Sequence, residues 1–184
     1  YFVMYKHLVN LCDGVPVFVD TYPDFAVTAE RLRPYVTERT RMMLLNTPAN
    51  PTGAVVPRDA LPAIADLARE KGLLLVSDEI YEAFCYDGDL ASIGALYPKT
   101  LVMGGFSKSH ALTGWRVGYV TGPAGIVQKM TMLQQYSFVC APSFAQYGAL
   151  EVFRHPDAAA AAITAMTEAF DRRRRLMHGR LTSI

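Results

Sequence analysis

The sequence predicts an α/β domain in which a mostly parallel sheet is covered by helices, and three observations lead to this class. Short apolar runs alternate with amphipathic helical runs at intervals of roughly 30 residues, the spacing of βαβ units. The candidate strands are β-branched or Leu-rich, as expected for a sheet with both faces covered. The chain has 184 residues, of which 51% are hydrophobic, so one domain can bury a sizeable core.

The first part of the chain is predicted to contain a helix end, a short strand and a second helix. Residues 6–12 close an opening helix, and a turn then leads to a short strand over residues 15–19. Thr28 is expected to cap a helix that ends near Pro34, because its hydroxyl can accept a backbone hydrogen bond in the first turn.

The central part of the chain is predicted to form most of the sheet. A buried strand over residues 41–45 precedes a loop over residues 46–53, whose prolines and glycine exclude a helix or a central strand. Pro57 opens a helix that Gly72 closes, at a position where a capping glycine is common. Further strands are expected at residues 73–76, 100–103 and 117–120, and further helices at residues 123–136, 142–153 and 156–181.

Composition excludes several classes of protein. The chain is too hydrophobic to be disordered, and its formal net charge of +1 gives no electrostatic reason to expect nucleic acid or an anionic membrane as a partner. No apolar run approaches the roughly 20 residues that span a bilayer. Cys12, Cys85 and Cys140 are scattered, which is typical of a reducing compartment and favours a cytoplasmic protein. The histidines lack metal-ligand spacing, so no metal site is expected.

Polar side chains gather where the predicted strands end. Asn46 and Asn50 follow the first strand of the sheet, Asp78 follows the second, and Ser107 and Lys108 follow the third. Parallel strands place their carboxyl ends on one edge, and ligands bind beyond that edge. The predicted topology therefore brings these residues to one side of the molecule.

Lys108 is the candidate nucleophile. It lies between an apolar strand and Ala111-Leu112, where partial desolvation would lower the pKa of its amine and make it reactive towards carbonyl groups. Viewed alone, the residue also fits a solvated surface lysine. A phosphate-binding P-loop is excluded, because that motif requires glycine directly before the lysine and Ser107 stands there.

Asp78, Tyr81 and Arg116 complete a set of chemical groups. A carboxylate at the end of an apolar strand is costly unless it is paired, so Asp78 either caps a helix or pairs with a cation in a ligand. Tyr81 would offer a phenol on the same side of the turn. Arg116 either grips a phosphate or forms a structural salt bridge. Together with the amine and amide, these groups suit an aromatic aldehyde that carries a phosphate and a basic ring nitrogen.

Three motifs in this order resemble those of the class I/II aminotransferases, which are pyridoxal-phosphate enzymes of the aspartate aminotransferase fold. The motifs are Asn46-x-Pro48-x-Asn50-Pro51-Thr52-Gly53, Ser77-Asp78-Glu79-Ile80-Tyr81 and Phe106-Ser107-Lys108-x5-Gly114-Trp115-Arg116-x-Gly118-Tyr119. The resemblance covers essentially the whole chain. It implies that residues 1–155 are the central part of the cofactor-binding large domain and that residues 156–184 are a helix leading towards a C-terminal small domain. Both ends of the sequence look cut, so we expect an internal piece, about half of a homodimeric protein.

The resemblance also implies a role for each residue in catalysis. Lys108 is similar to the lysine that forms the internal aldimine with pyridoxal 5'-phosphate and then moves a proton between substrate and cofactor. Asp78 is similar to the aspartate that pairs with the pyridine nitrogen, which lets the ring accept electrons. Asn50 and Tyr81 match the donors to the phenolic oxygen of the ring.

Recognition of the phosphate is implied for a separate group of residues. Arg116 matches the phosphate-binding arginine, and Ser107 adds a hydroxyl. Many relatives carry Ser or Thr three residues before the lysine, where this chain has Gly105, so one contact is replaced there by backbone N–H groups.

The expected function is therefore an aminotransferase that moves an amino group from an amino acid to a 2-oxo acid, with an aspartate-type preference as the nearest analogy. Two alternatives stay open. One is a lyase on the same scaffold, such as a carbon–sulfur β-lyase or a cyclopropane-forming synthase. The other is a non-catalytic sensor with an aminotransferase-like domain. The arginine run at residues 172–175 is expected to be a solvated helix face near the small-domain hinge.

Overall fold

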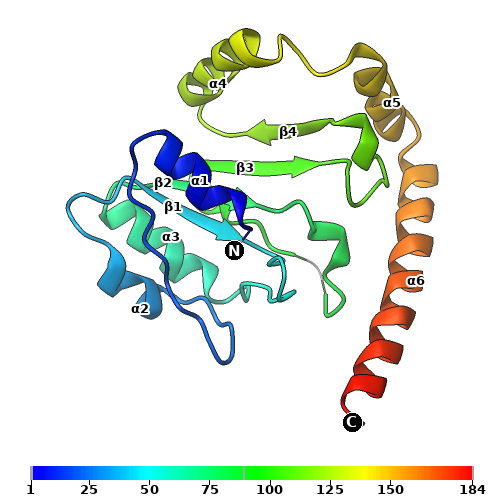
Figure 1. Ribbon diagram of the computed structural model, residues 1–184, viewed down its shortest axis with the longest axis horizontal. Coiled ribbons are helices and arrows are strands. Elements are labelled where there is room, and N and C mark those ends of the chain that lie inside the picture. The colour runs from blue at the N-terminus through cyan, green and yellow to red at the C-terminus, as the bar shows by residue number, and fades with distance from the viewer. Residues whose placement is uncertain (1, 89, 184) are drawn as a thin grey trace.

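The computed structural model describes residues 2–88 and 90–183, and within them four strands form one sheet in the order β1-β2-β3-β4 (Figure 1). The strands are β1 (Met42–Asn46), β2 (Leu74–Asp78), β3 (Thr100–Gly105) and β4 (Gly118–Thr121). The first three strands are parallel, and β4 runs antiparallel to β3. The predicted class, a mostly parallel sheet with helices, is therefore confirmed, and each of these strands lies within two residues of its expected position.

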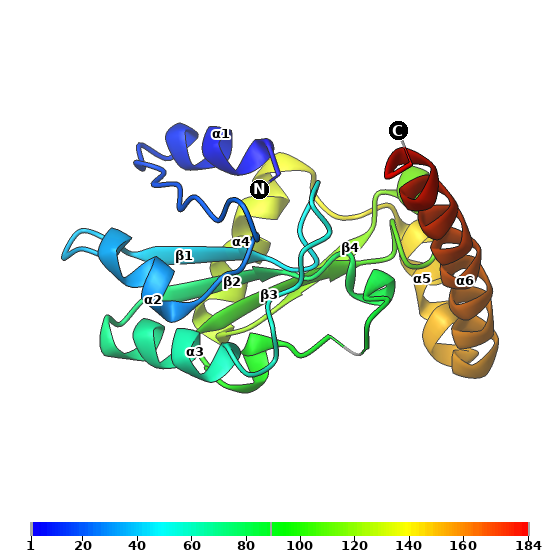
Figure 2. The same ribbon diagram turned by 90° about the horizontal axis from the view of Figure 1, so that it is seen from below.

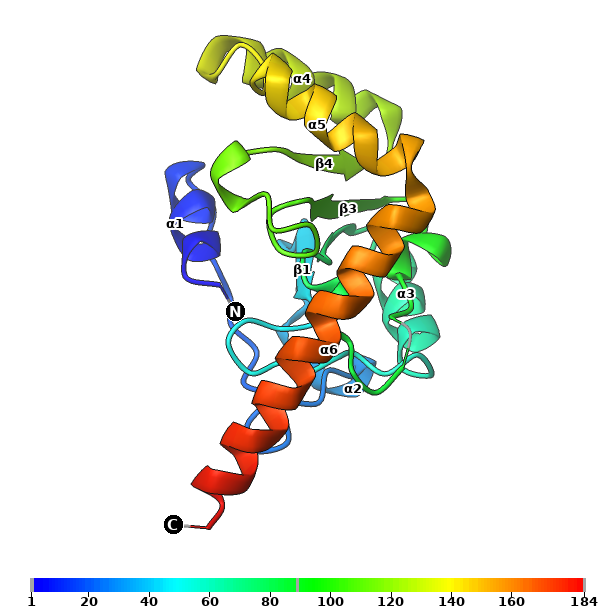
Figure 3. The same ribbon diagram turned by 90° about the vertical axis from the view of Figure 1, so that its right-hand side faces the viewer.

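Helices flank this sheet on both faces and at one end. They are α1 (Met4–Leu11), α2 (Ala29–Leu32), α3 (Leu61–Glu70), α4 (Ala124–Ser137), α5 (Ser143–Arg154) and α6 (Pro156–Leu181). In two views α1 and α3 lie on opposite sides of the sheet (Figures 2 and 3). The long helix α6 runs past the end of the sheet (Figure 1). None of the helices that the structure describes is long and apolar enough to cross a membrane.

The main core lies between α3 and the first strands of the sheet. The apolar positions of α3 recur at helical spacing, so one face of the helix is buried. Ile64 and Leu67 are fully buried there, together with Leu75 of β2. Burial of one such side chain contributes about 1.5–3 kcal/mol, and this cluster holds the ends of β1 and β2 in place.

A second, smaller cluster joins α5 to the segment between β3 and β4. Its buried members are Phe106, Val117, Ala145 and Ala149, and Leu112 packs against them. Phe106 and Val117 stand on either side of residues 107–116. The loop that carries Lys108 is therefore fixed at both ends against one helix.

Helix α6 is joined to the segment after β2 by aromatic contacts. The rings of Phe84 and Phe170 meet edge to face with centroids 5.7 Å apart, and the Arg174 guanidinium carbon lies 4.7 Å from the centroid of Tyr86. Residues 172–175 are exposed, and Arg174 and Arg175 pair with Asp171. The prediction of a solvated arginine face is confirmed.

Two of the predicted elements differ from the structure. Residues 15–19 are not a strand: the chain has no regular secondary structure there, Pro16 lacks an N–H, and Val15 is 79% exposed. Helix α3 begins at Leu61 and not at Pro57, because residues 58–60 first form a turn. The cap at Thr28 is confirmed, since its hydroxyl accepts a hydrogen bond from the Arg31 N–H at 3.4 Å.

Candidate active site

Strands β1 and β2 end side by side, in register, at Asn46 and Asp78. Both residues are the last of their strands, whereas the sequence places Asp78 just beyond its strand. The amide of Asn46 donates to the Asp78 carbonyl oxygen at 3.3 Å, and the Thr47 N–H donates to the same oxygen at 3.0 Å. The two strand ends are thus joined at one edge of the sheet.

The carboxylate of Asp78 is held by two donors. The Ile80 N–H donates to its Oδ1 at 3.2 Å, which closes a local turn, and no helix begins at Asp78, so the helix cap that its sequence context allows is not seen. The hydroxyl of Tyr5 on α1 donates to its Oδ2. Burial and this hydrogen bond raise the pKa of the Tyr5 hydroxyl, which keeps it protonated as a donor.

Sequence reasoning does not find Tyr5. The residue lies 73 positions before Asp78, on a different element, and no local pattern distinguishes it from other half-buried tyrosines. Only the packing of α1 on the sheet brings the two together. Tyr5 also meets Phe2 edge to face, with ring centroids 5.9 Å apart.

The loop after β1 presents Asn50 to Tyr81. The Asn46 side-chain oxygen accepts a hydrogen bond from the Asn50 N–H at 2.9 Å, and the buried Thr47 hydroxyl accepts one from the Val56 N–H at 3.0 Å. These bonds fix the loop, which has no regular secondary structure of its own. The Asn50 amide then donates to the Tyr81 hydroxyl oxygen at 3.5 Å.

Lys108 follows β3 and reaches the same group. It is half-buried, and its Nζ lies 5.7 Å from the centroid of the Tyr81 ring, within the range of a cation–π contact. Side chains from the ends of three strands therefore converge: Asn50 after β1, Tyr81 after β2 and Lys108 after β3. This convergence agrees with the arrangement that the parallel topology predicts.

The turn after β2 is fixed by a buried acid. The carboxylate of Glu79 accepts hydrogen bonds from the hydroxyls of Ser77 at 2.7 Å and Ser92 at 2.8 Å. The backbone N–H of Glu79 donates to the Met103 carbonyl oxygen at 2.9 Å. Burial of Glu82, with a smaller contribution from the negative charge of Glu79, raises the pKa of the Glu82 carboxyl. Glu79 thus anchors the segment on which Asp78 and Tyr81 lie.

Arg116 and Ser107 belong to one closed loop. The Thr113 hydroxyl donates to the Ser107 carbonyl oxygen at 2.7 Å, and the Arg116 Nη1 donates to the Thr113 carbonyl oxygen at 2.8 Å. Arg116 has φ +54° and ψ +45°, a left-handed conformation that bulky residues seldom adopt. Within the described part of the chain its exposed guanidinium has no acidic partner, so the salt bridge that its sequence context allows is not seen.

Gly105 stands where the resemblance leads one to expect a hydroxyl residue. A Cβ at this position would lie 3.1 Å from the Gly118 Cα, on the paired strand β4, and 3.1 Å from the Ile80 Cδ1. Both distances are tighter than most real contacts. The close approach of β4 therefore accounts for glycine here.

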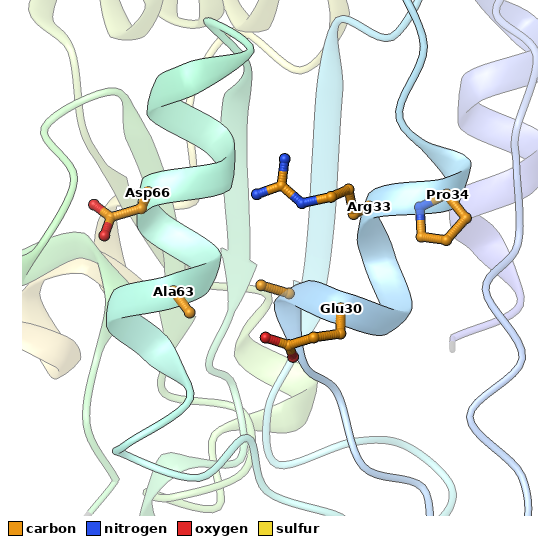
Figure 4. A pocket seen from close by; sticks show the side chains of 6 residues that line it. Glu30, Arg33, Pro34, Ala63 and Asp66 are labelled. Atoms are coloured by element: carbon orange, nitrogen blue, oxygen red, sulfur yellow. The ribbon is translucent and has the colours of Figure 1, made fainter.

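A separate pocket lies between α2 and α3 (Figure 4). Its lining residues are Ala29, Glu30, Arg33, Pro34, Ala63 and Asp66. None of them is a predicted site residue. This pocket is therefore separate from the candidate site at the strand edge.

Comparison with known proteins identifies the family of the chain. Residues 1–184 match the family described as Aminotransferase class I and II. Over its whole length the chain is 40% identical to an aspartate aminotransferase of Pyrococcus abyssi and 41% identical to aromatic-amino-acid aminotransferase 2 of Thermococcus litoralis, and it covers 48% of each.

A solved structure gives the same result for the fold. The aspartate aminotransferase from Thermus thermophilus with maleate aligns with a TM-score of 0.97 and 40% identity, over 100% of this chain and 49% of that one. The chain spans about half the length of the curated relatives it matches. Its motifs, its fold and these likenesses lead to one conclusion: the chain belongs to the class I and II aminotransferase family.

Proposed function

We propose that the full-length protein is a pyridoxal-phosphate-dependent aminotransferase that transfers an amino group from an amino acid to a 2-oxo acid. The observation that carries this proposal is the meeting of Lys108 Nζ with the ring of Tyr81, whose hydroxyl accepts from Asn50. Three strand ends contribute these groups, and Asp78 lies in register at the same edge. An amine, a phenol, an amide and a carboxylate are thereby held on one rigid frame.

The donor set fits the cofactor. Asp78 is an acid with two donors on its oxygens, suited to face a protonated ring nitrogen. The amide of Asn50 and the hydroxyl of Tyr81 suit a ring oxygen. The exposed guanidinium of Arg116 suits a phosphate, because its planar fork matches the phosphate oxygens. When bound, pyridoxal phosphate supplies an electron sink for charge that develops on the substrate Cα.

The residues of this chain have distinct tasks in the proposed reaction. Lys108 provides an amine that can attack a carbonyl carbon and can also take a proton from the substrate Cα and return it. Asp78 holds a proton on the ring nitrogen, and Tyr5 holds Asp78 in place through its hydroxyl. Glu79, buried beneath the turn, keeps Tyr81 at the strand edge. Arg116 and Ser107 bind and orient the phosphate.

The substrate is proposed to be of the aspartate type. One relative that supports this proposal is named an aspartate aminotransferase. Another relative is named an aromatic-amino-acid aminotransferase, which is the competing substrate class. Initial rates with aspartate and with tyrosine, each with 2-oxoglutarate as acceptor, separate the two classes. A higher kcat/KM for tyrosine would overturn the aspartate assignment.

The wider organisation of the protein is proposed on the same basis. We expect a homodimer in the cytoplasm, with residues 1–155 inside the large domain and α6 leading to a small domain. Exposed aromatic side chains on α4 and α5, such as Tyr136 at 84% and Tyr147 at 68%, support a covered face in the complete protein. Cys12, Cys85 and Cys140 are free thiols, which suits a reducing compartment.

The test of the proposed function uses the full-length protein. Titration with pyridoxal phosphate is followed by absorbance, borohydride reduction and peptide mapping. The expected result is a stable adduct on Lys108, which the Lys108→Ala variant lacks together with all turnover. An adduct elsewhere, or none, would contradict the proposal.

Products distinguish the alternatives on the same scaffold. Pyridoxamine phosphate and a 2-oxo acid, formed when an amino acid alone is added, support amino-group transfer. Release of ammonia with pyruvate from a β-substituted substrate would identify a lyase. An adduct on Lys108 without turnover of any amino acid would identify a sensor.

A further inference from the structure

Helix α5 has a notch at Gly148 that is filled by the indole of Trp115. A Cβ built at residue 148 would lie 2.4 Å from Cζ3, 3.1 Å from Cε3 and 3.2 Å from Cη2 of that ring. The first of these separations is shorter than real Cβ contacts, and the other two are tighter than most of them. Even alanine at position 148 therefore requires the indole to move.

Phe144, one turn earlier on α5, borders the same indole. The two ring centroids lie 5.8 Å apart at an interplanar angle of 59°. Helix α5 is itself fixed by Ala145 and Ala149, which are buried against Phe106 and Val117 at the two ends of the Lys108 loop. The position of Trp115 is thus set by a helix that is anchored to the loop it faces.

Trp115 directly precedes Arg116, whose left-handed backbone has to be maintained by its surroundings. Besides the contact of the indole with Gly148, two side-chain hydrogen bonds among the described residues hold the backbone near Arg116. They are the bond from Thr113 to the Ser107 carbonyl oxygen and the bond from Arg116 to the Thr113 carbonyl oxygen. Trp115 is 40% exposed, so its ring has room to move outward. A side chain at residue 148 would therefore swing the indole and redirect Arg116 without opening a core.

We infer that Gly148 is a positioning residue for Arg116: its missing side chain seats Trp115, and the seated indole aims the guanidinium at the cofactor phosphate. The inference rests on the proposed function, in which Arg116 is the phosphate ligand. Helix α5 contributes none of the site residues named above. The inference gives it an indirect part in binding the phosphate, through the position of Arg116.

The test compares pyridoxal phosphate with pyridoxal, which has the same ring and aldehyde but no phosphate. Both are titrated into the full-length apoprotein and followed by absorbance. In Gly148→Ala we expect the affinity for pyridoxal phosphate to fall about tenfold and that for pyridoxal to change by less than about twofold, because only the contact with the phosphate is displaced. A fold defect would weaken both ligands alike.

Two further variants sharpen the comparison. In Gly148→Ala combined with Trp115→Phe, the smaller ring fits the shallower notch, and the preference for the phosphorylated ligand should return. Gly179→Ala, in α6, is the matched control, because a Cβ there meets nothing within 4 Å. This control should retain the wild-type ratio of the two affinities.

Trp115→Leu covers the case in which Gly148→Ala does not fold, because it empties the notch and adds no atoms. It should show the same selective loss of affinity for pyridoxal phosphate. An unchanged ratio in Trp115→Leu, an equal loss for both ligands in a Gly148→Ala variant that folds as the wild type does, or the same selective loss in Gly179→Ala would each overturn the inference.

Failure of the proposed function gives a different result. A wild-type protein that forms no adduct on Lys108, or binds pyridoxal as tightly as pyridoxal phosphate, would overturn the function and this inference together. A wild-type protein that forms the adduct and prefers the phosphate, with a Gly148→Ala variant that behaves identically, would overturn the inference alone.

Discussion

The hydroxyl of Tyr5 on α1 donates a hydrogen bond to Oδ2 of Asp78 at the end of β2, across 73 positions of sequence. The pKa of the Tyr5 hydroxyl is raised by burial and by this bond, so the phenol stays a donor throughout the physiological range. The acid proposed to face the cofactor ring is thus held by a helix from the start of the described chain.

Removal of this donor should weaken catalysis more than folding. In Tyr5→Phe the ring remains but Asp78 loses the hydrogen bond from the hydroxyl, so we expect kcat/KM to fall about tenfold in the full-length enzyme. Steady-state kinetics measures the change. The control is Tyr22→Phe, which removes the hydroxyl of a tyrosine that is 73% exposed. Equal activity in the two variants would show that the bond to Asp78 has no part in catalysis.

The same bond predicts how stability depends on alkaline pH. The pKa of Tyr5 is higher in the folded protein than its ordinary value of 10.0, so the folded state keeps a proton that the unfolded state releases. The contribution to stability is complete below that value and is lost as pH rises above it. Urea unfolding between about pH 9 and 11 should show this fall in wild type, and Tyr5→Phe should make it shallower. An identical slope in both proteins would contradict the prediction.

A chain of aromatic rings links α6 to the neighbour of Lys108. Tyr81 and Phe84 have centroids 6.4 Å apart, and Phe84 and Phe170 have centroids 5.7 Å apart. In a double-mutant cycle with Phe84→Leu and Phe170→Leu, we expect a coupling of about 0.5–1.5 kcal/mol in the free energy of unfolding. Urea denaturation of the four proteins measures it. Additive effects would mean that the two rings do not support each other.

Gly105 should resist the hydroxyl side chain that the family resemblance leads one to expect there. Gly105→Ser places atoms against Gly118 Cα and Ile80 Cδ1, and we expect the free energy of unfolding to fall by about 1–3 kcal/mol. Ile80→Val removes the crowding Cδ1 and should recover part of the loss. Gly125→Ser, at an open position on α4, is the control for the substitution itself. Wild-type stability in Gly105→Ser would show that β4 can move aside.

Much of the site follows from local patterns in the sequence. Apolar runs that end in Asn46, Asp78 and Gly105 specify three parallel strands, and parallel topology alone brings the residues after them to one edge. The Thr28 cap and the start of α6 at Pro156 likewise depend on a few neighbouring residues, so they are read correctly.

Features that depend on distant contacts cannot be read in this way. The hydrogen bond of Tyr5 to Asp78 and the contact of Trp115 with Gly148 form only when separate helices pack. No pattern in the neighbouring sequence predicts either contact. The strand expected at residues 15–19 fails for a related reason. A strand is defined by hydrogen bonds to a neighbour, and the apolar pattern of Val15 to Val19 does not say whether a neighbour is present.

Phe106 and Val117 are buried together against α5, so both ends of the segment between them are held at one place. A segment held at both ends samples few arrangements, so the backbone that carries Lys108 moves little before any ligand arrives. Little backbone freedom is then left to lose on binding, and the ordering cost that remains is that of the Lys108 side chain itself.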